Sequence, residues 1–461
     1  MAPTVALTLD GEAVPNAILE HVTHTLAAAA SDDGETLAVE FWRGNTLLRT
    51  LDTAPFELEI SFSSVDSGLR EYRAVATDSA GLSAEDTLEV SINIAGGNLQ
   101  DISHDLFTGA IGSAGSAEFF GGAIAEIEGR LYVSATRSDG TGLLLATLPE
   151  LETQWERQFS GPLWSLSAAL GDEELAVAVA EPGAWVAHVL DRTDGSTNTS
   201  WVLGPRPKEF GVLGPQIAAT PAGLIATTTP RELALFDSDG NALGSEANLK
   251  NGVVTELITA SDGALVYVGF GDAFNESEAT CATNSDFCAQ AMLPGGGVSW
   301  VTGLSEQRAG IHRLAPTADG GAFVSAAVFD DKDSSFELLK LTTQGVIAET
   351  QLHGVAAVDE SGDRVMSLSP DNKGGVVACG GAGFLIDEDS SPSPVVYAFD
   401  SDLNTVWEAR DFVEAEDGAY ALACAVTDKS VFVYGLRDME VEFIDDEPYA
   451  VGSAWIARIS L

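Results

Sequence analysis

One short acidic stretch has the residue types of a calcium loop. ELALFDSDGNALG holds Asp237, Asp239, Gly240 and Asn241 in the order D-x-D-G-N, which matches the opening of an EF-hand loop. That loop needs a bidentate Glu at its twelfth position, and counting from Asp237 the twelfth residue is Asn248. Asp and Asn before Gly are typical of hairpin turns, because they tolerate a positive φ and bond their own backbone. The stretch is therefore interpreted as a turn.

Four longer acidic segments are the stronger candidates for metal binding. They cover residues 271–290, 329–337, 385–395 and 437–452. Calcium takes six to eight hard oxygen ligands, so we expect its ligands among Asp331, Asp333, Asp387 and Asp389. The alternative is a hydrated acidic surface that holds no ion.

The four cysteines form two candidate disulfides. Cys281 and Cys288 flank CATNSDFC, a small polar loop without histidine, which favours a loop disulfide over a zinc site. Cys379 and Cys424 lie in the strand-like runs GGVVACGG and YALACAVT, and they can pair only if the fold brings these strands together. An even count in so acidic a chain favours an oxidising compartment, and free thiols are the alternative.

Signatures of enzymes are missing from the sequence. It has no H-E-x-x-H, G-x-S-x-G, G-x-x-x-x-G-K-[ST] or C-x-x-C motif, and TRSDGTGLLL lacks the aromatic residue that closes a sialidase box. The six histidines are scattered, and His21 and His24 are expected on a strand surface. Paired carboxylates over a central channel remain a route to a polysaccharide hydrolase or lyase.

The charge of the chain limits its partners. Its 461 residues include 70 Asp and Glu against 22 Lys and Arg, a net charge of −48, while 45% of the residues are hydrophobic. Such a surface repels phosphate backbones, so nucleic acid is not expected as a partner. No apolar run is long enough to span a membrane, and MAPTVALTLDGE does not resemble a signal peptide. We expect a mature extracellular or surface-anchored region, such as a lipoprotein, with its export signal removed.

The elements that carry these residues divide into two parts. Residues 1–96 show short alternating strands, expected over 37–43, 45–51, 56–62, 69–77 and 87–93. In REYRAVATD the side chains of Tyr72, Ala74 and Ala76 share one face, as in a strand. Together with VEFWRGNTLLRTLDTAPFELEI, the stretch GLREYRAVATDSAGLSAED resembles bacterial Ig-like modules that accompany secreted enzymes and adhesins. The resemblance implies a β-sandwich spacer with Tyr72 in its core and no chemistry of its own.

Residues 97–461 contain a repeat. Six units return to the theme of four strands with a Gly turn and a last strand often carrying Trp, and a seventh unit, 419–461, stops after three strands. We therefore predict an all-β chain in which a seven-bladed β-propeller follows the sandwich, and 98–109 supplies the missing strand of the last blade. Six or eight blades are the alternatives, since the acidic segments interrupt the fourth and seventh units.

The repeats separate scaffold from function. Trp155, Trp201, Trp300 and Trp407 recur on the outermost strand, so we interpret them as packing residues. With the strands of a blade lettered a to d from the centre outward, the acidic segments fall at b–c connections, which lie on one face of a propeller. We expect a non-catalytic, monomeric binding or adhesion protein that contacts protein or glycan with this face. The alternatives are the hydrolase or lyase and a structural subunit of a surface assembly.

Overall fold

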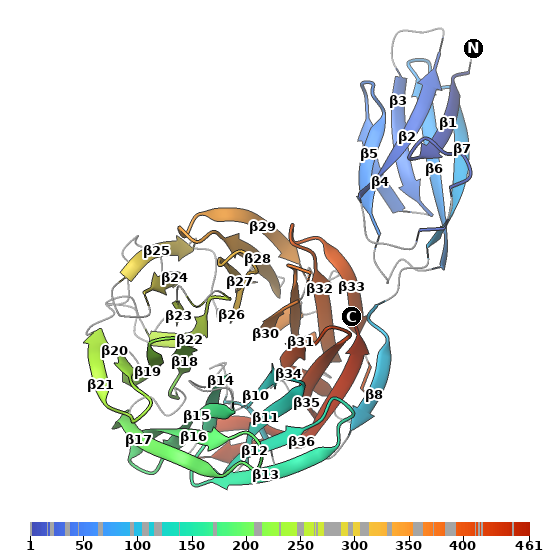
Figure 1. Ribbon diagram of the computed structural model, residues 1–461. Helices are drawn as coiled ribbons and strands as arrows, with labels where there is room; N and C mark the ends of the chain where they lie inside the picture. The colour runs from blue at the N-terminus through green and yellow to red at the C-terminus, as the bar shows by residue number, and fades with distance from the viewer. Residues whose placement is uncertain are drawn as a thin grey trace. The chain divides into compact units, whose positions relative to one another are not determined.

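The computed structural model shows a chain built from β-strands, with no helix among the residues it describes (Figure 1). Two compact units are present, one comprising Met1–Asn98 with Asn404–Glu408 and the other Leu99–Leu403 with Ala409–Leu461. No described helix is long and apolar enough to cross a membrane. The structure describes all residues except 1, 16, 19–22, 33–36, 45, 63–67, 93–95, 104–109, 115–121, 138, 169–172, 207–213, 230–231, 247–252, 262, 264–265, 272–286, 294–297, 305–312, 330–333, 354–362, 372, 383–392, 411, 414, 416–417 and 445–446.

The first unit is a sandwich of two antiparallel sheets. One sheet has the order β1-β2-β5 and the other β4-β3-β6-β7. The strands are β1 (Thr4–Leu9), β2 (Thr23–Ser31), β3 (Leu37–Arg43), β4 (Thr46–Leu51), β5 (Glu57–Ser61), β6 (Gly68–Asp78) and β7 (Ser83–Ile92). Their inward side chains, including Leu26, Phe41 and Val90, make one apolar core.

Alternation along β6 follows the sequence pattern. Tyr72, Ala74 and Ala76 are buried in the sandwich core, as their shared face predicts. The expectation for His24 is wrong, because its ring is buried against Phe62. A hydrogen bond of 2.6 Å joins His24 Nδ1 to Asp10 Oδ2, which compensates the buried imidazole. His21 lies outside the described residues. The resemblance to bacterial Ig-like modules stays a prediction.

The second unit is a β-propeller, which confirms the predicted fold class. Its described strands form seven antiparallel sheets arranged in a ring (Figure 1), and the first strands of several sheets line a central cavity. The first three sheets are β10 (Gly122–Ile127), β11 (Arg130–Thr136), β12 (Gly142–Thr147) and β13 (Thr153–Phe159); β14 (Leu163–Ala168), β15 (Glu174–Glu181), β16 (Ala184–Asp191) and β17 (Thr197–Pro205); and β18 (Ile217–Thr220), β19 (Gly223–Thr229), β20 (Glu232–Phe236) and β21 (Ala242–Glu246).

The next three sheets repeat the same order from the channel outward. They are β22 (Val253–Thr259), β23 (Val266–Gly271), β24 (Phe287–Met292) and β25 (Val298–Leu304); β26 (Arg313–Pro316), β27 (Ala322–Phe329), β28 (Ser334–Leu341) and β29 (Ile347–His353); and β30 (Asp363–Pro370), β31 (Val376–Ala382), β32 (Ser393–Phe399) and β33 (Thr405–Arg410). Each sheet is connected strand to strand in sequence order, so every blade is an up-and-down meander.

The last sheet joins the two ends of the propeller chain. It contains β34 (Ala419–Val426), β35 (Ser430–Ile444), β36 (Glu447–Ser460), β8 (Leu99–Ser103) and β9 (Ala110–Ala114), and both β8 and β9 pair with β36. An early segment therefore covers the edge of the final strand, which removes an exposed hydrogen-bonding edge.

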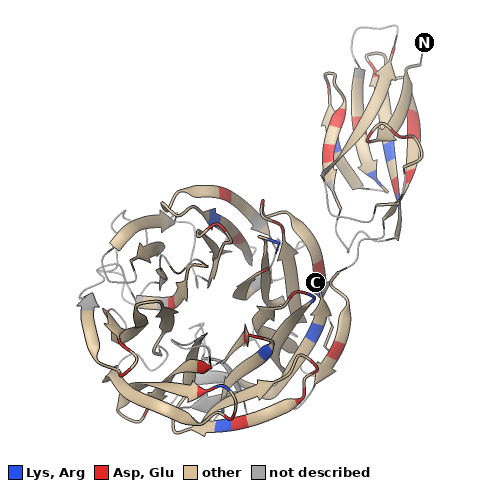
Figure 2. Ribbon diagram, in the orientation of Figure 1, with Lys and Arg blue, Asp and Glu red and all other residues tan. Residues whose placement is uncertain are grey.

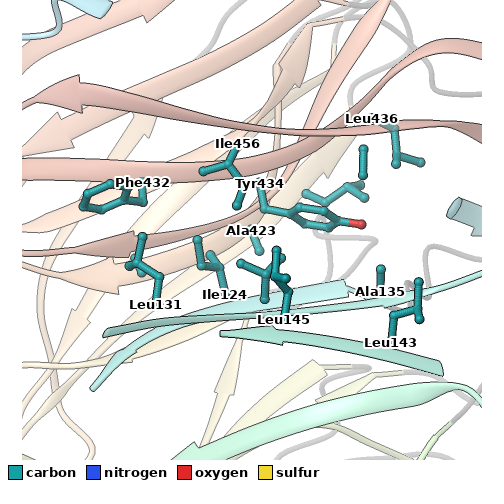
Figure 3. Close-up of a cluster of buried hydrophobic side chains, with 14 of the residues drawn as sticks. Ile124, Leu131, Ala135, Leu143, Leu145, Ala423, Phe432, Tyr434, Leu436 and Ile456 are labelled. Carbon is teal, nitrogen blue, oxygen red and sulfur yellow. The ribbon is translucent and has the colours of Figure 1, made fainter. Parts of the chain in front are cut away.

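Apolar side chains close the ring between the first and last sheets. Leu131, Val133 and Leu145 of the first sheet pack with Phe432 and Ile456 of the last (Figure 3). Corresponding clusters lie between the first and second, second and third, third and fourth, fourth and fifth, and fifth and sixth sheets. Burial between sheets thus fixes the inner strands around the channel.

One expected loop is a strand pair instead. Residues 437–452 were predicted as an irregular b–c connection, but β35 and β36 run on through this segment as an antiparallel hairpin, with Glu440 opposite Val451 and Ile444 opposite Glu447. Pairing of β9 with β36 extends this hairpin on its other side. In MEVEFI, apolar residues alternate with glutamates, which is the pattern of a strand. The acidic composition of the segment favours a loop instead.

Candidate ligand site in the central channel

The predicted calcium ligands cannot be placed. Asp331, Asp333, Asp387 and Asp389 all lie outside the described residues. Within the described part of the chain, no group of three or more His, Cys, Asp or Glu side chains comes together as a metal site would. Acidic positions are spread around the ring (Figure 2), and calcium at the b–c connections stays a prediction.

The D-x-D-G-N stretch is a hairpin turn, as the sequence analysis predicts. It joins β20 to β21, and Asp237 Oδ1 accepts hydrogen bonds from the backbone N–H groups of Asp239 and Asn241 at 3.0 and 2.8 Å. Hydrogen bonds from Asn241 lower the pKa of the exposed Asp237 carboxyl. Gly240 takes a φ of 81°, in the left-handed region.

This turn has a packing role that explains the repeated tryptophans. A Cβ added to Gly240 would lie 2.6 Å from the ring of Trp201 in the preceding blade. Gly195 faces Trp155 and Gly345 faces Trp300 in the same way, each glycine in a c–d turn with positive φ. Trp155 and Trp300 also donate Nε1 hydrogen bonds to carbonyls of the facing turns, at 3.1 and 2.8 Å. These tryptophans are inter-blade packing residues.

The two cysteine pairs have different outcomes. Cys288 is disulfide-bonded, and Cys281 lies outside the described residues. Cys379 and Cys424 are buried free thiols, which corrects the disulfide expected for them. The fold brings them together, since contact with Cys424 is among the causes, after burial, that raise the pKa of Cys379. The Cys424 thiol lies 3.9 Å from the carbonyl oxygens of Ser367 and Val377, as a weak donor would.

The innermost strands carry bulges that shape the channel. In β14, β22, β30 and β34 the register with the second strand shifts by one residue, just before Ser165, Glu256, Ser367 and Ala423. A bulge inserts one residue and re-aims the side chains around it. The inserted Trp164, Met366 and Leu422 all line a channel cavity of about 500 Å³. Met366 and Leu422 are buried in the cluster between the first and last sheets, and Trp164 packs against the cluster between the second and third, so the bulges turn large side chains toward neighbouring blades.

The residue after the bulge connects neighbouring blades. Ser165 Oγ accepts the backbone N–H of Ile217 in the next blade at 3.3 Å, and Ser367 Oγ accepts that of Cys424 at 3.3 Å. Glu256 occupies the same position in β22, and its Oε2 accepts the N–H of Leu314 at 2.5 Å. A hydroxyl suffices for this bridge in two blades, so the carboxyl at 256 is a departure from the repeat.

Glu256 is the most perturbed carboxyl among the described residues. Its side chain is enclosed by the channel wall and only partly open to the cavity, and this burial raises its pKa from 4.5 to about 7. The charge of Arg313 and the Leu314 N–H act in the opposite direction and lower the pKa, but desolvation outweighs them. Perturbed carboxyls in cavities are candidates for binding or proton transfer.

Arg313 faces the same cavity from β26. Its Nε donates a 2.5 Å hydrogen bond to the carbonyl of Met366 in the following blade. Glu126 also lines the cavity, but its Oε1 accepts the N–H of Gly129 in the β10–β11 turn at 2.5 Å. The channel wall thus combines aliphatic side chains, Trp164 and Gln216 with a single carboxyl of raised pKa.

Sequence reasoning missed this site, although one signal was present. Setting LWSLSA, VVTELIT and RVMSLS in register aligns Ser165, Glu256 and Ser367. A lone carboxyl within an apolar innermost strand is unusual and marks the position. The sequence pattern predicts binding at the variable connections and assigns the regular strands to the scaffold.

Comparisons with known proteins found a distant structural likeness. No family model matches the chain, and no curated protein matches it. Among solved structures, the chain is similar to the WD40 β-propeller domain of Doa1 at 14% identity and a TM-score of 0.44, over 77% of this chain and 96% of that one. A likeness this distant carries no information about ligand or activity.

Proposed function

We propose that the chain is a non-catalytic binding or adhesion protein, exported or anchored at a cell surface, that contacts a protein or glycan with the b–c face of its propeller. The observation that supports it is the contrast between connections. β15 ends at Glu181 and β16 begins at Ala184, whereas β23 ends at Gly271 and β24 begins at Phe287. Long connections on a rigid scaffold are where binding usually lies.

Two further features support export and a scaffold role. A disulfide at Cys288 is typical of an oxidising compartment. The Trp–Gly contacts between blades and the β8–β36 pairing hold the ring together without using the b–c connections. Those connections are therefore open to variation in sequence without loss of the scaffold.

The proposal is tested with charge-neutralising variants on opposite faces. Binding of the purified chain to a glycan array and to intact cells is measured with and without calcium, for wild type, D331N/D333N and D239N/D402N. The second variant removes two charges from exposed c–d turn positions. We expect binding to fall only for the b–c variant, and a calcium-dependent signal places the ion there. Equal binding by both variants, or no binding by wild type, contradicts the proposal.

A propeller hydrolase or lyase acting on polysaccharide is a second candidate, and Glu256 favours it. A carboxyl with a pKa near 7 is suited to act as a general acid at neutral pH. Release of reducing ends from a polysaccharide panel between about pH 5 and pH 8 measures this activity, with Glu256→Gln as the control. Activity that survives the substitution excludes Glu256 as the acid.

A further inference from the structure

The channel cavity has a lining of mixed polarity, in which polar groups outweigh apolar ones. Its volume of about 500 Å³ falls within the range of small-molecule sites. The half-buried Leu166 and Ile258 contribute aliphatic surface, and Trp164 lies at the edge of the cavity with its ring packed against the cluster between the second and third sheets. The Nε1 of that ring is buried, with no acceptor among the described residues.

Glu256 offers this cavity one unused acceptor. Oε2 is taken by the N–H of Leu314, but Oε1 has no hydrogen-bond partner among the described residues. Serine makes the equivalent inter-blade hydrogen bond in β14 and β30 with a single oxygen. The hydrogen bond between blades therefore does not explain why Glu256 has a second oxygen. An ionised carboxylate in such a site lacks the solvation it would have in water, and a ligand donor can supply it.

We propose that the central channel binds a small organic cation, an ammonium group on a small apolar body, with the ammonium N–H donating to Glu256 Oε1 and the apolar body against Leu166 and Ile258. An ammonium group supplies both the donor and the opposite charge, which strengthens the hydrogen bond. The net charge of −48 raises the local concentration of cations around the protein. The site is distinct from the b–c face, so its test is independent of that surface.

Among the groups near the carboxyl, Arg313 on β26 favours the ionised form of Glu256. Glu126 on β10 and Cys424 on β34 also line the cavity, and the Cys424 thiol is directed at the carbonyl oxygens of Ser367 and Val377. Because Glu256 has a pKa of about 7, the ammonium competes with a proton for the carboxylate. The carboxyl is about nine-tenths ionised at pH 8 and about one-tenth at pH 6, so the apparent affinity falls about tenfold over this interval.

The test uses three ligands that share a ring and differ in charge. Binding of benzylammonium, benzyl alcohol and benzoate to the full chain is measured by isothermal titration calorimetry at about pH 8 and pH 6, in roughly 0.5 M NaCl to screen exposed acids. We expect benzylammonium to bind tightest, with about tenfold weaker binding at pH 6. Near pH 7, titrations in buffers of different ionisation enthalpy should show release of about half a proton.

Two variants separate the channel site from the acidic surface. Glu256→Ser keeps a hydroxyl for the bridge to Leu314 and should abolish both the preference for benzylammonium and its pH dependence. Glu349→Ser removes an exposed acid on β29 and should change neither. The proposal is overturned if benzoate binds as tightly as benzylammonium, if Glu256→Ser leaves the affinity within about twofold of wild type, or if no probe binds.

Discussion

The stability of the propeller should depend on pH through Glu256. Its folded pKa of about 7 exceeds the ordinary 4.5, so between these values the folded state binds more protons than the unfolded state. Wild-type stability is therefore lost as pH rises from about 4.5 to about 7, and it stays lowered above that. A difference of about 2.5 pKa units corresponds to roughly 3 kcal/mol. Because the side chain is partly open to the cavity, we expect about 1–3 kcal/mol.

The Glu256→Gln substitution measures this pH-dependent contribution to the free energy of unfolding directly. The amide keeps an oxygen for the Leu314 N–H and cannot ionise, so the advantage of the variant over wild type should grow from little near pH 4.5 to about 1–3 kcal/mol at pH 8. Urea unfolding of both proteins at four pH values across this range gives the difference, with the exposed Glu349→Gln as a pH-independent control. A variant less stable than wild type at pH 8 would refute the reasoning, because the pair with Arg313 would then outweigh desolvation.

Three further predictions follow from the packing. Gly240→Ala should cost about 2–4 kcal/mol in urea unfolding, and Gly140→Ala, which has nearly the same φ and open space at Cβ, about 1–2; equal losses would exclude the tryptophan contact. Burial lowers the pKa of His353 to about 4, so stability present above about pH 6.5 is lost as pH falls toward 4; His353→Gln should remove about 1–3 kcal/mol of this dependence, and an unchanged slope contradicts it. Unfolding without reductant should expose two titratable thiols, Cys379 and Cys424, whereas none would indicate a second disulfide.

Local patterns in the sequence predicted much of the fold. The run LAVEFWR matches β3 at both ends, and the D-x-D-G-N turn was assigned from its glycine and its missing twelfth ligand. The positions of Trp201 and its equivalents on outer strands also followed from the repeat, because packing between blades imposes the same residue each time. Such features depend on neighbours in the chain or on one repeated contact, and both leave a periodic signal.

The channel site depends on contacts between residues that are far apart in the sequence. A bulge shifts the register of one strand by one residue, and alternation of apolar residues does not reveal where the shift occurs. The bridge from Glu256 reaches Leu314, which lies in another blade and 58 positions further along the chain. The partnership of Arg313 with the Met366 carbonyl is of the same kind. The raised pKa is a consequence of this enclosure, which only the assembled ring creates.

The expected loss of stability from the buried carboxyl of Glu256 bears on the role of this residue. Two other blades make the same inter-blade bridge with Ser165 and Ser367, at no cost in buried charge. We expect a carboxyl at this position to make the protein less stable at neutral pH than an uncharged bridge would, in which case the bridge alone does not account for it. If Glu256→Ser proves at least as stable as wild type at pH 8, the structural requirement is met by serine. The carboxyl is then retained for what it does in the channel, where binding of a cation would return the lost stability by mass action.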